Sequence, residues 1–276
     1  MTDWRIALPM YGVTASARAA QHALLFRLIT HLHDIGWEGR IVIVVPEGAL
    51  PVHWLDPHLL LSQTCGYPLM TYLRGKVTLL STPQYRCAGC TGTHYSSRIV
   101  VREADLHTSL SAYRGRTAAI NSEDSNSGTN VLRHALIPWV DQAQGGTFFS
   151  DVVVSGGHLQ SLSLLQTGRV DVAAIDAVTW SLLEGTAPER LAGLRTLQYS
   201  VSAPALPFIG SRHLTPAQQQ MIRAALDLLV AHDADLLEAL KIAQFNTLDW
   251  HAYETILDIQ ECARNAGVVP LRTNVR

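Results

Sequence analysis

The chain has 276 residues, of which 47% are apolar and 16% are charged, and this balance excludes a disordered chain. Its 21 basic and 23 acidic side chains leave a formal charge of −2, so no surplus of positive charge is available to neutralise a nucleic-acid backbone. The longest apolar runs, such as residues 41–45, are far shorter than the ~18 residues that a membrane helix needs. We therefore expect one large or two smaller globular domains, no nucleic-acid partner and no membrane insertion.

Short strands and amphipathic helices alternate over the first third of the chain. Strands are predicted over residues 5–11, 40–45, 59–63 and 77–81, with a short helix after Gly66. A longer helix is predicted over residues 15–35, with Thr14 or Ser16 as its N-cap and Gly36 as its stop. The β-branched run at 40–45 has no polar alternation, which predicts a strand buried on both faces.

The alternation begins again at Tyr95 and ends in a tail that is expected to be purely helical. Further strands are predicted over residues 97–102, 117–121, 151–154, 170–175, 194–199 and 207–210. Helices are predicted over residues 127–140, 158–167 and from Asp176 to Gly185, and in the tail over 216–231, 234–243 and 250–266.

Strands that alternate with helices are typical of mainly parallel sheets covered by helices on both faces. Two such sets predict an α/β protein with two lobes. Residues 1–94 and 200–276 are expected to form the first lobe and residues 95–199 the second, with the chain crossing near Tyr95 and Tyr199. Because open α/β sheets bind ligands at the carboxyl ends of their strands, we expect the ligand cleft between the lobes.

A polar, hydroxyl-rich loop joins the strand at 117–121 to the helix that follows it. This loop contains Ser125, Asn126, Ser127 and Gly128. Backbone N–H groups at a helix start favour an anion, the hydroxyls add donors, and glycine permits close approach, so the segment suits an oxyanion such as phosphate. The alternative, which the pattern alone favours, is an ordinary helix cap with turn residues.

Further candidates occupy similar positions. His158 follows a strand and two glycines. Asp176 ends another strand, where three roles are open to it: contact with a cationic ligand group, a hydrogen bond to the hinge, or the cap of the next helix. From the first lobe, Tyr11, Gln63 and Thr64 end strands, and Tyr95 lies at the expected crossing. Each of these four residues is by itself more often structural than functional.

No catalytic constellation or metal motif stands out. The chain has neither a G-x-S-x-G nucleophile elbow nor an H-E-x-x-H or P-loop motif, and only two lysines, Lys76 and Lys241. Cys87 and Cys90 have the spacing of a zinc or redox motif, but plain loop cysteines are the simpler interpretation. A disulfide between Cys65 and one of this pair requires an oxidising compartment. We therefore expect no enzyme activity, no cofactor and no metal.

Several segments together resemble the phosphate, phosphite and phosphonate substrate-binding proteins of ABC transporters. The matching segments read LLSQTCGYPL at 60–69, YSS at 95–97, DSNSG at 124–128, GH at 157–158 and GRVDVAAID at 168–176. The resemblance implies the two-lobed type II periplasmic-binding-protein fold. It also implies a solute-binding protein that closes on a small oxyanion, an ABC permease as partner and a periplasmic or extracytoplasmic location.

The resemblance also implies roles for individual residues. Ser125, Asn126 and Ser127 match the family's Ser-Thr-Ser loop that holds phosphonate oxygens, with Asn126 at the position of the threonine. His158 matches the family's histidine and Tyr95 its crossover tyrosine, whereas Tyr11 is a looser match and Asp176 is the one counterpart for an amine-binding acid.

Two alternatives remain open at this stage. Because no secretory leader precedes residue 5, the printed sequence taken by itself predicts a cytoplasmic protein. Such a protein is either an enzyme that makes cofactor precursors on the same fold, or a ligand sensor that acts through a partner protein.

Overall fold

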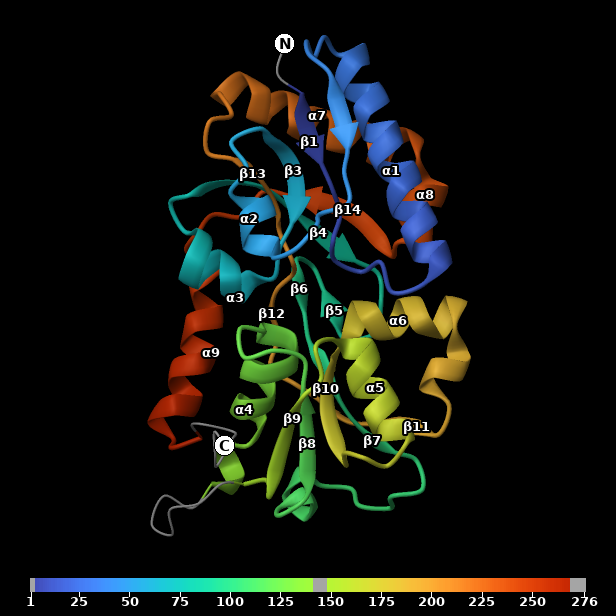
Figure 1. Ribbon diagram of the computed structural model, residues 1–276, viewed down its shortest axis with the longest axis vertical. Helices are drawn as coiled ribbons and strands as arrows, with labels where there is room; N and C mark the ends of the chain where they lie inside the picture. Colours follow the sequence, from blue (N-terminus) through green and yellow to red (C-terminus); the bar gives the residue numbers. More distant parts are fainter. Residues whose placement is uncertain (1–2, 141–147, 269–276) are drawn as a thin grey trace. The chain divides into compact units, whose positions relative to one another are not determined.

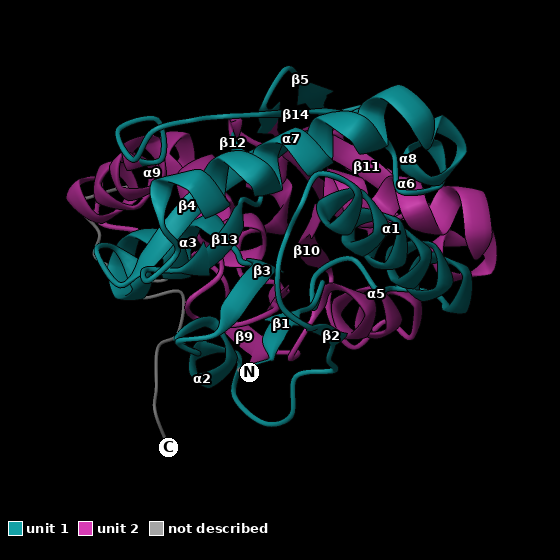
Figure 2. Cartoon of the chain, turned by 90° about the horizontal axis from the view of Figure 1, so that it is seen from above, with its two compact units in different colours: residues 1–94, 204–253 teal, residues 95–203, 254–276 magenta. Residues whose placement is uncertain are grey.

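The computed structural model describes residues 3–140 and 148–268. The chain divides into two compact units, coloured separately in Figure 2. The first unit comprises Met1–His94 and Pro204–Tyr253, and the second comprises Tyr95–Ala203 and Glu254–Arg276. The chain thus changes unit three times, and each unit is described below by itself.

The first unit is built on a six-stranded mixed sheet in the order β14-β4-β13-β3-β1-β2. Its strands are β1 (Trp4–Ile6), β2 (Ile41–Ile43), β3 (Leu59–Gln63), β4 (Val77–Tyr85), β13 (Phe208–Ser211) and β14 (Ile242–Asn246). β1 pairs in parallel with β2 and β3, whereas β13 and β14 add antiparallel pairs. All five residues of β3 are buried, as expected for a strand in the middle of the sheet.

Helices cover this sheet on both sides, with α1, α7 and α8 together on one side (Figure 1). The helices are α1 (Ala15–Asp34), α2 (Leu50–Trp54), α3 (Gly66–Pro68), the π-helix η1 (Leu69–Leu73), α7 (Pro216–His232) and α8 (Ala234–Ala239). Thr14 caps α1 by accepting from the Ala17 amide at 3.1 Å. Thr215 and Gln218 form a reciprocal capping box at the start of α7.

The second unit contains a five-stranded sheet in the order β11-β7-β10-β8-β9. Its strands are β7 (Ser97–Arg102), β8 (Thr117–Ile120), β9 (Asp151–Val154), β10 (Val172–Asp176) and β11 (Leu194–Tyr199). β8 pairs in parallel with both β10 and β9, while β7 is antiparallel to β10 and β11. The sheet is therefore parallel on the side that carries the predicted oxyanion loop.

Helices also flank the second sheet, with α5 and α6 on one side of β8–β10 and α4 and α9 on the other (Figure 1). The helices are the π-helix η3 (Asn126–Asn130), α4 (Val131–Ala135), α5 (His158–Gln166), α6 (Ala177–Thr186) and α9 (Glu254–Asn265). Short 3-10 turns are η2 (Leu110–Tyr113), η4 (Ile137–Trp139) and η5 (Pro188–Leu191). The small strands β5 (Cys90–Thr91), β6 (His94–Tyr95) and β12 (Ala203–Pro204) form a third sheet in the order β12-β6-β5.

Three details of the sequence-based description were wrong. β2 is the edge strand of its sheet and only partly buried, because no strand among the described residues pairs with its second side. The tail is not purely helical, since β14 follows α8 and pairs with β4. The helix predicted over 127–140 is divided into η3, α4 and η4.

The tail also differs from the predicted grouping of lobes. Helix α9 packs against α4 and η3 and is grouped with the second unit, whereas the sequence placed residues 200–276 as a whole with the first lobe. The predicted boundary of the first lobe at residue 94 coincides with the first change of unit.

Candidate functional site

Two strand-to-helix turns of the second unit lie side by side at one edge of its sheet. β8 leads into η3 and β9 leads into α5, and these two strands are parallel neighbours with Ile120 opposite Val154. Two backbone hydrogen bonds join the turns, from the Ser155 amide to the Ile120 carbonyl at 2.8 Å and from the Gly156 amide to the Asn121 carbonyl at 2.9 Å. The carboxyl ends of parallel strands are where open α/β sheets bind ligands.

Ser127 and His158 meet across these two turns. The Oγ of Ser127 and the Nε2 of His158 are 3.0 Å apart, although 31 positions separate the residues in the sequence. Ser125 has a different role, since its Oγ accepts from the Gly128 amide at 3.1 Å and so caps η3. The cap that the sequence pattern favoured is therefore present, and the neighbouring Ser127 hydroxyl faces the histidine.

Position 128 requires a glycine because the Asn121 side chain lies directly against its backbone. A Cβ atom at this position would stand 1.9 Å from Oδ1 of Asn121, well inside van der Waals contact. The absence of a side chain thus lets the Asn121 amide lie directly against η3, and the close approach expected of Gly128 is made to a protein side chain.

Three amide side chains at these turns have polar atoms without hydrogen-bond partners among the described residues. Asn126 and Asn130 are both fully buried, and neither the oxygen nor the nitrogen of either side chain is bonded. The Oδ1 of Asn121 is likewise unbonded. A buried amide without a partner costs roughly 1–3 kcal/mol, so such groups mark a place where a bound polar molecule would restore the missing bonds.

The imidazole of His158 is neutral at pH 7. Burial lowers its pKa to about 4, and the nearby Ala174 backbone only partly offsets this. A neutral ring has one N–H donor and one acceptor nitrogen, so His158 can bond to Ser127 or to a ligand oxygen but brings no positive charge.

Asp176, the predicted contact for a ligand amine, caps helix α6. Its Oδ1 accepts from the amides of Val178 at 2.8 Å and Thr179 at 3.0 Å, and the side chain is buried. The cap alternative for this residue is therefore confirmed.

Sequence reasoning missed a cationic group at the end of this sheet. Arg98, on β7, places its guanidinium carbon 5.0 Å from the ring centre of Trp180 and 5.2 Å from that of Tyr199. Its Nη1 also donates to the Thr196 hydroxyl at 3.1 Å. The available signal was an arginine directly before the apolar run Ile99–Val101 of this strand, because such a side chain needs aromatic or polar neighbours.

The predicted residues of the first unit form a connected group of their own. Gln63 donates to the Tyr85 hydroxyl and to the Leu206 carbonyl, both at 3.0 Å. Tyr11 packs edge-on against Tyr85 with ring centres 5.5 Å apart. Tyr11 has a φ of 63°, an uncommon value for a residue with a side chain, of the kind found at functional turns.

The remaining two candidates are buried. The Thr64 hydroxyl donates to the Cys65 carbonyl at 3.2 Å, and Tyr95 is enclosed at the point where the chain changes unit. Tyr95 belongs to the same unit as Ser127, whereas Tyr11, Gln63 and Thr64 belong to the first unit. A ligand site that joins all of them to Ser127 therefore stays a prediction.

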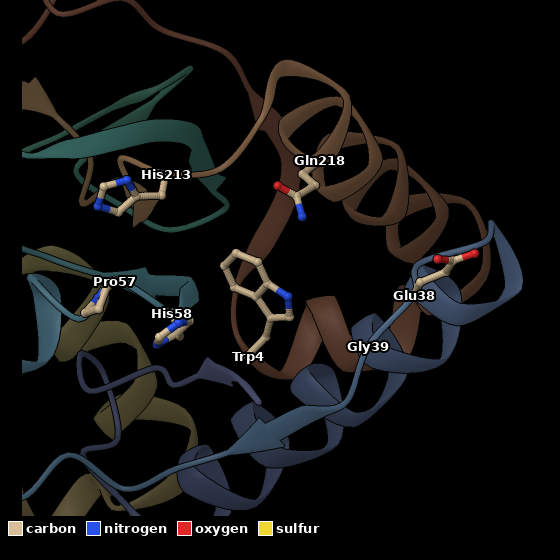
Figure 3. A pocket seen from close by; sticks show the side chains of 7 residues that line it. All are labelled: Trp4, Glu38, Gly39, Pro57, His58, His213 and Gln218. Carbon is tan, nitrogen blue, oxygen red and sulfur yellow. The ribbon is translucent and has the colours of Figure 1, made fainter. Parts of the chain in front are cut away.

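A cavity of about 620 Å³ lies elsewhere on the first unit (Figure 3). Figure 3 shows the Trp4 indole in the middle of the lining residues, with His58 and His213 on one side and Glu38 on the other. His58 precedes β3, so this cavity is at the amino end of that strand and Gln63 is at the other end. None of the predicted site residues lines it. Of the residues that the structure describes, no group of three or more His, Cys, Asp or Glu side chains is arranged to hold a metal ion.

Several solved structures share the fold of this chain. A binding protein component of an ABC phosphonate transporter from Pseudomonas aeruginosa has a TM-score of 0.74 at 15% identity, with 99% of this chain and 90% of that chain covered. PhnD1 from Prochlorococcus marinus, solved with methylphosphonate, has a TM-score of 0.73 at 15% identity, with 97% and 99% covered. XAC2383 from Xanthomonas citri, solved with ATP, has a TM-score of 0.68 at 16% identity, with 98% and 100% covered. The fold is that of the type II periplasmic-binding proteins.

The family to which this chain belongs is shown by a match to a family model. The family model described as ABC transporter, phosphonate, periplasmic substrate-binding protein matches residues 58–253, which is more than half of the chain. The chain therefore belongs to the phosphonate substrate-binding proteins of ABC transporters. A search of curated proteins gave no match. Over residues 3–140 and 148–268, no helix has the length and apolar character needed to cross a membrane.

Proposed function

We propose that this protein binds a small phosphonate-like or phosphate-like oxyanion and delivers it to an ABC permease from the periplasmic or extracytoplasmic side. The observation that carries the proposal is the meeting of Ser127 and His158 at two joined turns that also contain buried amides without partners. The ligand oxygens would accept from the Ser127 hydroxyl, the Asn126 amide and backbone N–H groups of the loop, and His158 would donate its ring proton.

The proposed binding site is polar but carries no net charge. Ser125, Asn126, Ser127 and Gly128 carry no charge, and His158 is neutral near pH 7 because burial lowers its pKa. An oxyanion in such a site is stabilised by oriented dipoles and hydrogen bonds. We propose that Tyr11 and Tyr95, as the family resemblance implies, and Gln63 and Thr64, from their position after a strand, contribute further contacts by hinge closure.

The same geometry argues against hydrolytic chemistry by the Ser127 and His158 pair. A serine nucleophile needs a histidine base that is oriented by a third group, commonly a carboxylate. Among the described residues no carboxylate contributes to the pKa of His158, and a ring with a pKa of about 4 is a weak base at pH 7. We propose that the protein has no catalytic activity, and a nitrophenyl ester assay should show no hydrolysis that depends on His158.

Isothermal titration calorimetry with methylphosphonate, phosphite and phosphate tests the binding proposal. We expect saturable heat with at least one of the three, and Ser127→Ala should weaken the affinity by ~10-fold or more because one hydrogen bond to an anion is lost. Ser163→Ala, an exposed position on α5, is the matched control and should bind like the unaltered protein. A folded protein that gives no heat with any of the three anions would refute the proposal.

A further inference from the structure

The turn between β4 and β5 brings two cysteines together. Residues Cys87, Ala88, Gly89 and Cys90 form a tight turn in which the Cys90 amide donates to the Cys87 carbonyl at 3.0 Å. Gly89 has a φ of 97°, which suits the third position of a type II β-turn and favours glycine. The first and fourth Cα atoms of such a turn lie within about 7 Å, which overlaps the range that disulfides span.

The two sulfur atoms are already close. The Sγ of Cys87 and the Sγ of Cys90 are 3.1 Å apart, and both residues are half-buried next to the exposed Ala88. A disulfide bond is about 2.05 Å long, so closing it requires the sulfurs to approach by about 1 Å. Small side-chain rotations achieve this without unfolding the turn.

We propose that Cys87 and Cys90 form a redox pair that is oxidised to a disulfide within this turn. This inference rests on the turn and the thiol geometry, and it does not depend on which anion the protein binds. The oxidant is a disulfide compound or a thiol–disulfide oxidoreductase, as oxidising compartments provide.

The reaction proceeds by two thiol–disulfide exchanges. One cysteine, as its thiolate, attacks a sulfur of the oxidant, and the oxidant's own S–S bond breaks to release one thiol. The second cysteine then attacks the mixed disulfide, forms the Cys87–Cys90 bond and releases the second thiol. Two protein thiols are oxidised, the oxidant gains two electrons, and the two thiol protons end on its two released thiols.

The alternatives for this pair have less support. A zinc site needs further ligands, and no group of three or more His, Cys, Asp or Glu side chains in the described part of the chain is arranged to supply them. Cys65, which the sequence allows as a partner of one of this pair in an oxidising compartment, lies at the start of α3, and Cys262 is exposed on α9. Cys65 is therefore the competing partner that the experiment must distinguish.

The sequence offers a direct chemical test. Trypsin cleaves after Arg86 and Arg98, so Cys87 and Cys90 share the peptide 87–98, whereas Cys65 falls in 41–74 and Cys262 in 242–264. The full-length protein is equilibrated with oxidised and reduced glutathione, alkylated with N-ethylmaleimide, digested and analysed by mass spectrometry. With oxidised glutathione in excess, we expect peptide 87–98 without label and about 2 Da lighter than its reduced form.

Variants supply the controls. In Cys87→Ser and in Cys90→Ser, the remaining cysteine cannot close the intramolecular bond, so it should carry either a glutathione in a mixed disulfide or the label. Cys65→Ser and Cys262→Ser should leave peptide 87–98 oxidised. Full labelling of this peptide in excess oxidised glutathione would overturn the proposal, and so would recovery of 87–98 cross-linked to 41–74. The mass and labelling of peptide 87–98 from the unaltered protein test the proposal even if a variant fails to fold.

Discussion

The buried imidazole of His158 makes the stability of the protein depend on pH in a defined direction. The ring binds a proton near pH 6.5 in the unfolded chain, but in the folded chain burial lowers its pKa to about 4. As the pH falls from about 6.5 towards 4, the unfolded state takes up a proton that the folded state does not. The free energy of unfolding therefore decreases over this interval and is greatest above it.

The magnitude follows from the difference between the two pKa values. About 2.5 pKa units at 1.36 kcal/mol each give about 3 kcal/mol. This figure is an upper bound because His158 as a whole keeps some contact with solvent, although its Nδ1 is enclosed. Urea unfolding of the unaltered protein and of His158→Gln, measured at intervals between pH 7.5 and 4, isolates the contribution of this one ring.

We expect the unaltered protein to lose stability more steeply than His158→Gln, so that the difference between the two changes by about 2–3 kcal/mol across this pH range. Carboxylates that titrate in the same range affect both proteins alike. His22→Gln, at an exposed position on α1, controls for the loss of an imidazole as such. Parallel curves for the unaltered protein and His158→Gln would refute the reasoning.

Further variants test the packing and capping described above, each by urea unfolding at pH 7.5. Gly128→Ala should lower the free energy of unfolding by about 1–3 kcal/mol because its Cβ overlaps Asn121. Gly185→Ala should be neutral or stabilising, because a Cβ there meets no described atom within 4 Å apart from its own helix backbone. Thr215→Ala should cost about 1 kcal/mol through loss of the capping box on α7, and an unchanged midpoint would contradict that role. Asp233→Asn should cost about 1–3 kcal/mol, since this partly buried carboxylate bonds to an arginine and a histidine of α1 at 2.6 Å each. The same two partners outweigh burial and lower the pKa of Asp233, so its contribution disappears as the pH falls through that lowered value.

Much of the fold was predictable because its signals are local. The cap at Thr14, the capping box at Thr215 and the positions of β3, β7, β9 and β11 all follow from periodicity and capping patterns within a few residues. The loop containing Ser127 was likewise located from a strand, a polar turn and a helix in succession. The sequence also predicted the cap at Asp176 as one of three alternatives, and the structure contains it.

Other features depend on partners far away along the chain. β14 was missed because its five residues become a strand only by pairing with β4, where Ile242 lies opposite Tyr85. The same holds for β2, whose β-branched composition predicted burial on both faces although it lies at the edge of the sheet. A strand's neighbours, and therefore its burial, are properties of the assembled sheet.

The candidate site likewise combines features that local sequence predicts with features that only tertiary contacts determine. Residue type and position were enough to single out Ser127 and His158 separately, since each follows a strand that should end in a turn. Only the parallel pairing of β8 with β9 decides that the two side chains meet at 3.0 Å and that desolvation keeps the imidazole neutral. The sequence determined which chemical groups stand at the ends of strands, and the tertiary structure decided which of them share one environment, because hydrogen bonding and burial act through space and not along the chain.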